Sequence, residues 1–456
     1  MNHKKIILPI LMASMFMNGL LMNGVVVILG SIGTSMNLDA AQLALTPWVL
    51  TAYMLGNTLT MPLFGKITDI YGRRKTFIAC LGAFVILTFA CGLTHSIYTL
   101  ITMRFLSGLA GGGFQPAIYA IIADTYNHNN RAGALGTFQM GLFFAQAIGP
   151  VFAGIIIKYL SWHWFFFAVV PFGAAGVVLS LVYLKETMPT HTRLAGKFDY
   201  MGLSLITSGL FALVYGFTNL NHTTVYAYTT GGILLLAAIV LTLFFRYEHH
   251  AQSPIIHPEL LKNRNILFAN AVQLIDSLVL LWAFTFLVVL LQRRFDLTSI
   301  ESGALFIPYS ISLAISAPLF GKIADKAGTK PVIIGGTLLF SAGMFAISAA
   351  DTIPLFAIGL MGLGAAFGMI GSALGAFVVN SVPPHHTGIA TSMYGISRTV
   401  GMAVGPVAGG IFVSITSDAA AFTHSYTVAA VLSLLAVIFA LGLGADEKYA
   451  DKEVTI

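Results

Sequence analysis

One carboxylate stands in the middle of a long apolar segment. Asp276 lies about eleven residues into the stretch 265–291, which otherwise consists largely of Leu, Val, Ala and Phe. Asn270 and Gln273 precede it at intervals of three, so a helix would carry the three polar side chains on one face. In a lipid bilayer an ionised group at this depth costs at least about 2.5–3.5 kcal/mol, which makes it a candidate functional site. We predict that Asp276 binds a proton or a cation; a structural ion pair with Arg398 is the alternative.

Few other polar side chains interrupt the apolar segments. Arg104 lies about a quarter of the way into 98–123, where its charged end could simply reach toward the membrane surface. Gln115 and Asn23 could line a pathway, although an amide in such a segment is more often a hydrogen bond between helices. The predicted proton and substrate pathway consists of Asp276, Gln273, Asn270, Arg104, Gln115, Asn23 and Arg398.

A charged turn occurs twice. Residues 62–75 hold four basic residues, one acid and two glycines, and eight of the eleven residues from 62 to 72 recur at 318–328. The offset is 256 residues, and it also relates Gly-Pro-Val at 149–151 to Gly-Pro-Val at 405–407. The sequence therefore contains an internal duplication.

The composition is that of a membrane protein. Hydrophobic residues make up 57% of the chain and charged residues only 9%, against about 25% charged in soluble domains. The net charge of +6 does not indicate a nucleic-acid partner, because the basic residues lie mainly in connections between apolar segments. Fourteen such segments are expected: 6–30, 45–64, 76–94, 98–123, 132–158, 164–184, 200–219, 227–246, 265–291, 302–320, 331–349, 354–380, 389–415 and 425–444.

An even number of spans places both termini on one side of the membrane. With that side in the cytoplasm, the inner connections and tails hold 18 of the 23 Lys and Arg residues. This distribution follows the positive-inside rule and predicts cytoplasmic termini. We expect a multi-pass protein of the plasma membrane, in contact with its lipids.

The offset of 256 residues corresponds to eight segments. Two six-helix repeats separated by two extra helices explain it more simply than an eight-helix repeat, for which fourteen spans are too few. We therefore predict an all-α membrane fold with an N-terminal bundle at 1–199, two inserted helices and a linker at 200–264, and a C-terminal bundle at 265–456.

These landmarks resemble the major facilitator superfamily, and the fourteen expected spans resemble its drug:proton antiporter branch. The resemblance covers nearly the whole chain. It is carried by three patterns: Gly65, Asp69, Gly72, Arg73 and Arg74 in the first turn, Arg104 with Gly108 at 104–108, and Gly149, Pro150 and Gly154 in the segment 132–158.

The resemblance implies roles for these residues. Asp69 would meet the cytoplasmic end of a helix from the other half, and the basic residues beside it would engage Asp124, so that the turn acts as a cytoplasmic latch. The plainer alternative is a basic loop that only anchors helices to lipid headgroups. The second turn keeps an acid, Asp325, but has Thr329 and Lys330 in place of the two arginines, which predicts an asymmetric latch.

Two further roles follow from the same resemblance. Arg104 matches an arginine implicated in proton transfer. The Gly-Pro pattern at 149–154 matches the antiporter signature, thought to bias an exporter against leak, although small residues at this spacing also occur in ordinary helix contacts.

The chain departs from the branch at one position. Where its members carry an Asp in their first helix, this chain has Met22, within Leu21-Met-Asn-Gly. We expect a secondary transporter that exports lipophilic small molecules by alternating access, probable exchange for protons being left to Asp276. A lipid or metabolite flippase or exporter without proton coupling is the alternative, and a membrane sensor is a third class. No nucleotide-binding, metal-binding or catalytic pattern is present in the sequence, so we expect no cofactor and no enzymatic activity.

Overall fold

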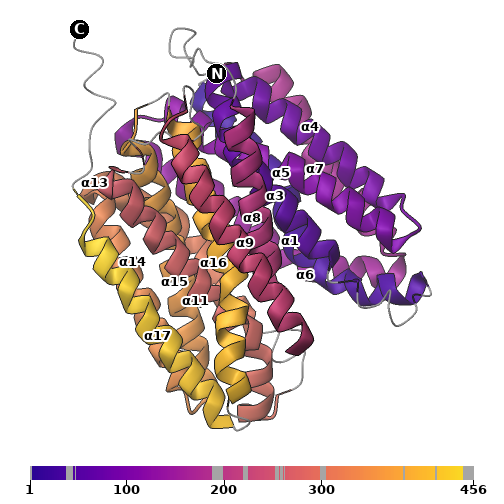
Figure 1. Cartoon of the computed structure of the whole chain (residues 1–456), viewed down its shortest axis with the longest axis vertical. Coiled ribbons are helices and arrows are strands. Elements are labelled where there is room, and N and C mark those ends of the chain that lie inside the picture. Colours follow the sequence, from indigo (N-terminus) through magenta and orange to yellow (C-terminus); the bar gives the residue numbers. More distant parts are fainter. Residues whose placement is uncertain are drawn as a thin grey trace. The chain divides into compact units, whose positions relative to one another are not determined.

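The computed structural model describes residues 3–36, 38, 45–46, 48–186, 199–218, 224–251, 256, 260, 262–297, 305–383, 386–415 and 419–444. Within these ranges the chain is entirely helical, as predicted, with fourteen helices (Figure 1). They are α1 (His3–Ser35), α3 (Trp48–Tyr71), α4 (Arg73–Gly92), α5 (Ile97–Thr125), α6 (His128–Tyr159), α7 (His163–Tyr183), α8 (Tyr200–Thr218), α9 (Thr224–Glu248), α11 (Arg264–Phe295), α13 (Phe306–Ala327), α14 (Thr329–Ser348), α15 (Ile353–Asn380), α16 (Thr387–Ile415) and α17 (Ala419–Leu441).

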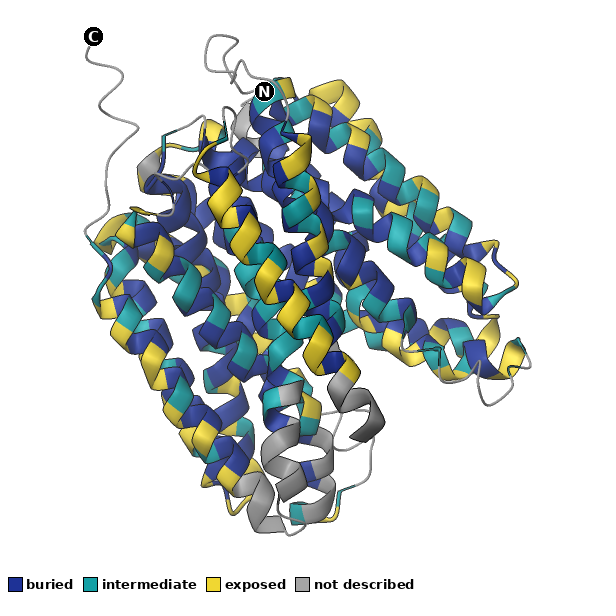
Figure 2. Ribbon diagram, in the orientation of Figure 1, coloured by how far each residue is buried: buried dark blue, intermediate teal, exposed yellow. Residues whose placement is uncertain are grey.

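Eleven of the described helices are long and apolar enough to cross a membrane. Apolar side chains also cover much of the outer surface: Leu235, Leu236 and Ile239 on α9 are exposed, as are Leu434 and Ile438 on α17. Figure 2 shows such exposed residues along the outward faces of both helices. Surfaces of this kind are stable against lipid chains and not against water, which identifies a multi-pass membrane protein.

The ends of two helices are set by glycine and not by the loss of apolar residues. The helices α3 and α13 run through the charged residues that follow their apolar stretches, to Tyr71 and Ala327. Both stop at a glycine with positive φ, 101° at Gly72 and 91° at Gly328. Only glycine adopts this conformation at little cost, so the two repeated turns share one backbone shape.

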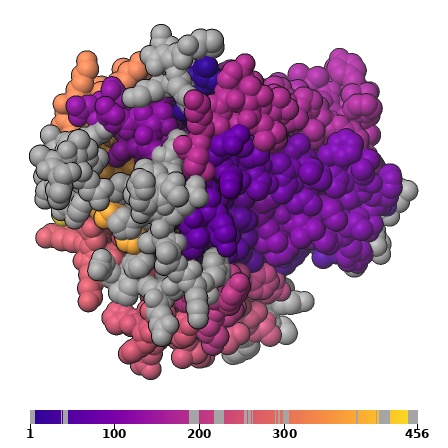
Figure 3. All heavy atoms as spheres, turned by 90° about the horizontal axis from the view of Figure 1, so that it is seen from above, coloured from indigo at the N-terminus to yellow at the C-terminus, as the bar shows by residue number. Residues whose placement is uncertain are grey.

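The chain divides into two compact units. Unit 1 comprises Met1–Tyr126, Met140–Gly196 and His385–Ser392, and unit 2 comprises Asn127–Gln139, Lys197–Pro384 and Met393–Ile456. The first turns of α6 therefore belong to unit 2, and those of α16 belong to unit 1. Figure 3 shows the same chain as spheres, coloured along the sequence, with the residues outside the described ranges in grey. The predicted domain boundaries near 199 and 264 stay a prediction.

The two units repeat the same helix pairing. In unit 1, α3 packs on α5, and α4 packs on α5 and α7; in unit 2, α13 packs on α15, and α14 packs on α15 and α17. A Cβ atom on Gly108 would meet the carbonyl oxygen of Tyr53, and one on Gly364 would meet that of Tyr309. Both members of this contact are 256 residues apart, so the duplication in the sequence is also a duplication of packing.

Candidate functional site

Asp276 lies inside unit 2 on α11, and its side chain is buried, with 1% exposed. Neither carboxylate oxygen has a hydrogen-bond partner among the described residues. An unpaired ionised carboxylate is costly away from water, whereas a protonated one is much less so. The group is therefore suited to binding a proton or a cation.

The polar neighbours on α11 bond elsewhere. The amide of Gln273 donates to Ser277 Oγ at 2.8 Å, and Asn270 donates to the carbonyl oxygen of Ile266 at 2.8 Å. Asn270 also accepts a hydrogen bond from Ser397 Oγ of α16 at 3.0 Å. The shared helix face predicted from the spacing is thus engaged in contacts within and between helices, and Asp276 is left without a partner.

Arg398 does not form the ion pair considered as the alternative. Its half-buried guanidinium lies over the ring of Phe367, with 5.8 Å from Cζ to the ring centroid. Among the described residues, no ion pair joins Arg398 to Asp276. The interpretation of Asp276 as half of a structural ion pair is therefore wrong for this conformation.

Arg104 is buried in unit 1 between α3 and α5. Its side chain is 1% exposed, its Nε donates to the carbonyl oxygen of Val49 at 3.1 Å, and its Cζ lies 4.5 Å from the centroid of the Tyr53 ring. The hydroxyl of Tyr53 in turn donates to Asn18 Oδ1 of α1 at 2.6 Å. Since the guanidinium is enclosed by protein, the alternative of an arginine reaching the membrane surface is not supported.

The two predicted pathway amides differ in their surroundings. Asn23 is exposed and donates to the carbonyl oxygen of Gln146 on α6 at 3.0 Å, which makes it a contact between helices. Gln115, in the middle of α5, is half-buried. Neither lies in a recorded contact with Arg104.

The Gly-Pro pattern of α6 forms a close contact with α1. A Cβ atom on Gly149 would lie 2.8 Å from the carbonyl oxygen of Leu20 and 3.2 Å from the amide nitrogen of Gly24. Pro150 lies inside the helix, and a Cβ atom on Gly154 would meet nothing within 4 Å. The pattern therefore divides into a contact glycine and one that faces open space.

The same contact recurs between α16 and α11, and it sets the correspondence between the repeats. A Cβ atom on Gly405 would meet the Leu278 carbonyl oxygen and, at 2.9 Å, the Trp282 amide nitrogen. Leu278 and Trp282 follow Leu20 and Gly24 by 258 residues, two more than the offset found elsewhere. In this register the counterpart of Asp276 is Asn18. One unit carries an unpaired acid where the other carries a hydrogen-bonded amide.

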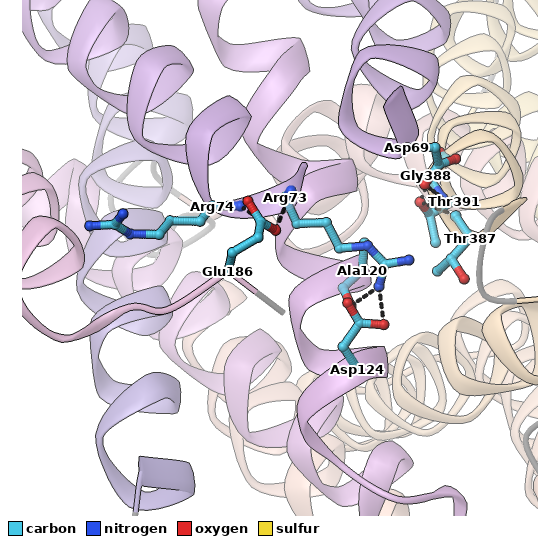
Figure 4. A network of polar contacts seen from close by, with 9 residues as sticks. All are labelled: Asp69, Arg73, Arg74, Ala120, Asp124, Glu186, Thr387, Gly388 and Thr391. Atoms are coloured by element: carbon cyan, nitrogen blue, oxygen red, sulfur yellow. Dashed lines mark hydrogen bonds and ion pairs between the residues drawn. The ribbon is translucent and has the colours of Figure 1, made fainter. Parts of the chain in front are cut away.

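The first charged turn contains a buried helix cap (Figure 4). Asp69, with 0% exposed, accepts hydrogen bonds at 3.2 Å from the backbone amides of Gly388 and Ile389 in the first turn of α16. A carboxylate at this position satisfies otherwise unbonded amides and favours the helix dipole. The close approach depends on Gly65, where a Cβ atom would meet Ser392 Oγ. The contact expected for Asp69 is present.

The two arginines of the turn have separate partners. Buried Arg73 forms an ion pair with Asp124 and donates from Nη1 to the Ala120 carbonyl oxygen at 2.8 Å, both on α5. Arg74, half-buried, donates from Nη2 to the Leu181 carbonyl oxygen of α7 at 2.9 Å. The predicted engagement of Asp124 thus belongs to Arg73.

Asp325 makes the equivalent cap in unit 2. Its two oxygens accept hydrogen bonds at 2.8 Å from the amides of Ala132 and Gly133 in the first turn of α6. The carboxylate contacts of the two turns are therefore alike, and any asymmetry has to come from the arginines.

One residue of this network was not predicted from the sequence. Glu186 follows α7 and accepts hydrogen bonds from the amides of Arg73 at 2.9 Å and Arg74 at 3.4 Å, which caps the first turn of α4. Its signal was its position, as an acid in a connection on the same predicted side as the basic turn.

Comparisons with known proteins agree with this architecture. The family model described as Major Facilitator Superfamily matches residues 11–291 and 269–455. The chain is 30% identical over 372 residues to the multidrug transporter protein MdtP of Bacillus subtilis, covering 80% of this chain and 67% of the relative. It is 26% identical to a multidrug resistance protein B homolog of Mycobacterium tuberculosis, covering 85% and 71%.

Solved structures share the fold at low sequence identity. The proton:xylose symporter XylE matches with a TM-score of 0.70 at 14% identity, covering 100% of this chain and 99% of XylE. The human organic anion transporter MFSD10 matches with a TM-score of 0.70 at 16% identity, covering 96% and 99%. Two repeated helical units, the capped turns and a family match over nearly the entire length agree: this chain is a membrane transporter protein that belongs to the major facilitator superfamily.

Proposed function

We propose that the protein exports lipophilic small molecules by alternating access, in exchange for protons that bind to Asp276. The observation that carries the proposal is the carboxylate of Asp276, buried on α11 with both oxygens unpartnered among the described residues. Protonation removes a charge that is costly in the interior, and access to water restores it. A carboxyl group that alternates between these environments carries a proton in each cycle.

The nature of the cargo is supported by the relatives and by the polarity of the helices. Curated relatives include proteins named multidrug transporters, and one from Streptomyces glaucescens is named a tetracenomycin C resistance and export protein, 24% identical over 379 residues. The membrane segments of this chain contain few charges and many Phe, Met and Leu residues. A lipophilic compound matches such a pathway.

We further propose that the capped turns stabilise one conformation of the cycle at the cytoplasmic face. Asp69 and Asp325 each bind the first turn of a helix that both compact units share. Breaking these caps exposes amides that have no partner within their helix. The orientation, with both termini in the cytoplasm, is supported by the distribution of Lys and Arg.

The experiment measures drug efflux into everted vesicles with and without a proton gradient. We expect Asp276→Asn to lose gradient-dependent uptake of a fluorescent cationic dye by at least tenfold, because the amide cannot exchange a proton. Asp351→Asn is the matched control, since the Asp351 side chain is 88% exposed and bonded to Arg294 at 2.8 Å. Unchanged coupling in Asp276→Asn would refute the proposed role of this residue.

A flippase or lipid exporter without proton coupling is the second candidate, favoured by Met22 and by the amide at Asn18, which leave α1 without an acid. Reconstitution in liposomes separates the two. Movement of labelled phospholipid that is equal with and without a pH gradient would support the second candidate and exclude the first.

A further inference from the structure

The guanidinium of Arg104 is buried with part of its hydrogen-bonding capacity unused. Its Nε bonds to Val49, and one face of the planar group lies against the Tyr53 ring. Nη1 and Nη2 have no hydrogen-bond partner among the described residues, although the side chain is 1% exposed. The unsatisfied edge is the one that presents parallel N–H groups, the arrangement that binds carboxylates and other anions.

The neighbouring side chains of unit 1 do not neutralise this charge. The titratable groups that act electrostatically on Arg104 are Cys91 and Tyr53. A thiol and a phenol are both largely uncharged at pH 7. Arginine itself does not lose its proton in proteins, so it cannot escape the cost of burial in the way that a carboxylate does.

The described acids of unit 1 lie at the opposite end of the helices. Asp124 follows Arg104 on α5 by twenty residues, about 30 Å at the rise of a helix. Asp69 follows Val49, the residue that Arg104 contacts on α3, by the same number. Glu186 bonds to the Arg73 amide at that same far end. Among these residues, none is a counter-charge for Arg104.

Other parts of the molecule do not provide the missing acceptor. The hydroxyl of Tyr53 donates to Asn18, so the oxygen of that amide is already used. An isolated buried cation costs several kcal/mol unless it is paired. An acceptor that carries negative charge from outside the chain would remove this cost.

We propose that Nη1 and Nη2 of Arg104 bind a monovalent anion, which is either chloride from the medium or the carboxylate of a small organic acid. The site lies within unit 1, between α3 and α5. It is a binding site that does not depend on the proposed export or on its direction, and it is separate from the proton site at Asp276.

The test is equilibrium binding of radiolabelled chloride and, separately, of radiolabelled acetate to the purified full-length protein in chloride-free detergent buffer. We expect saturable binding of one anion per chain. Binding of labelled chloride identifies the medium as the source, and binding of acetate alone identifies a carboxylate. Absence of saturable binding of both anions would overturn the proposal.

Three variants assign the binding to Arg104. Arg104→Gln should abolish it, and Arg104→Lys, which keeps the charge but loses the paired N–H groups, should weaken it at least tenfold. Arg246→Gln removes the same charge from an exposed position on α9 and should bind as the unaltered protein does. If Arg104→Gln cannot be purified, unaltered affinity in Arg104→Lys would still overturn the site. Because no transport is measured, the outcome is independent of the Asp276 experiment.

Discussion

At the scale of single residues, equivalent positions in the two units carry different chemistry. Asn18 and Asp276 occupy the same place in the contact between paired helices, as the glycines of α6 and α16 show. Asn18 bonds to Tyr53, whereas Asp276 has no partner among the described residues. The exchange of one amide for one acid is therefore sufficient to give the two units different roles in a proton cycle.

The two adjacent arginines of the first turn provide a matched comparison. Arg73→Gln breaks a buried ion pair with Asp124, and we expect a loss of about 3–5 kcal/mol in the free energy of unfolding. Arg74→Gln loses a partly exposed hydrogen bond to Leu181, and we expect less than about 1 kcal/mol. Unfolding by SDS in mixed micelles measures both. Equal losses would show that the turn acts through its net charge and not through Arg73.

At the scale of helices, close contacts depend on which glycine faces a neighbour. Gly149→Ala should destabilise the pairing of α6 with α1 by about 1–3 kcal/mol, because the added Cβ meets backbone atoms of Leu20 and Gly24 that cannot rotate away. Gly154→Ala, on the same helix, should be neutral or stabilising, since its Cβ meets nothing within 4 Å. Thermal unfolding in detergent compares them. A larger loss in Gly154→Ala would contradict the described packing.

The helices themselves could be predicted from the sequence. Fourteen apolar segments became fourteen described helices, because each needs only enough apolar length to cross a membrane. Their ends were less predictable: the segment expected at 302–320 is observed at Phe306–Ala327, since backbone hydrogen bonding continues past the apolar residues to Gly328.

The partners of polar side chains could be predicted only where a family resemblance supplied them. The cap at Asp69 and the pairing of Asp124 were expected in this way. The cap at Glu186 and the bond from Tyr53 to Asn18 were not, because they join residues far apart in the chain whose types alone do not identify each other. The two-residue shift between α1 and α11 was also invisible, since neither helix has a charged landmark in common with the other.

At the scale of the whole molecule, each compact unit contains one carboxylate cap. Asp69→Ala and Asp325→Ala should each cost about 0.5–2 kcal/mol through the loss of acceptors for two backbone amides. Since the caps lie in different units, the double variant should show the sum of the two losses within about 0.5 kcal/mol.

The measurement is the free energy of unfolding of the single and double variants under one set of conditions. A departure from additivity well beyond this range would mean that the two caps are broken together in a single cooperative step. That result would favour their joint action in the transport cycle over independent stabilisation.

The positive-φ glycines at the two turns separate shape from charge. Gly72 and Gly328 specify the same bend, yet the residues that follow are Arg73 in one turn and Thr329 in the other. Across the turn, the counterpart of Asp124 is Asn380, so acid and base have disappeared together from the second copy, and Asn380 bonds instead to Arg131. A duplicated scaffold of this kind can lose an entire ion pair without changing its backbone. The two ends of the duplication are thus free to acquire different strengths while keeping one geometry.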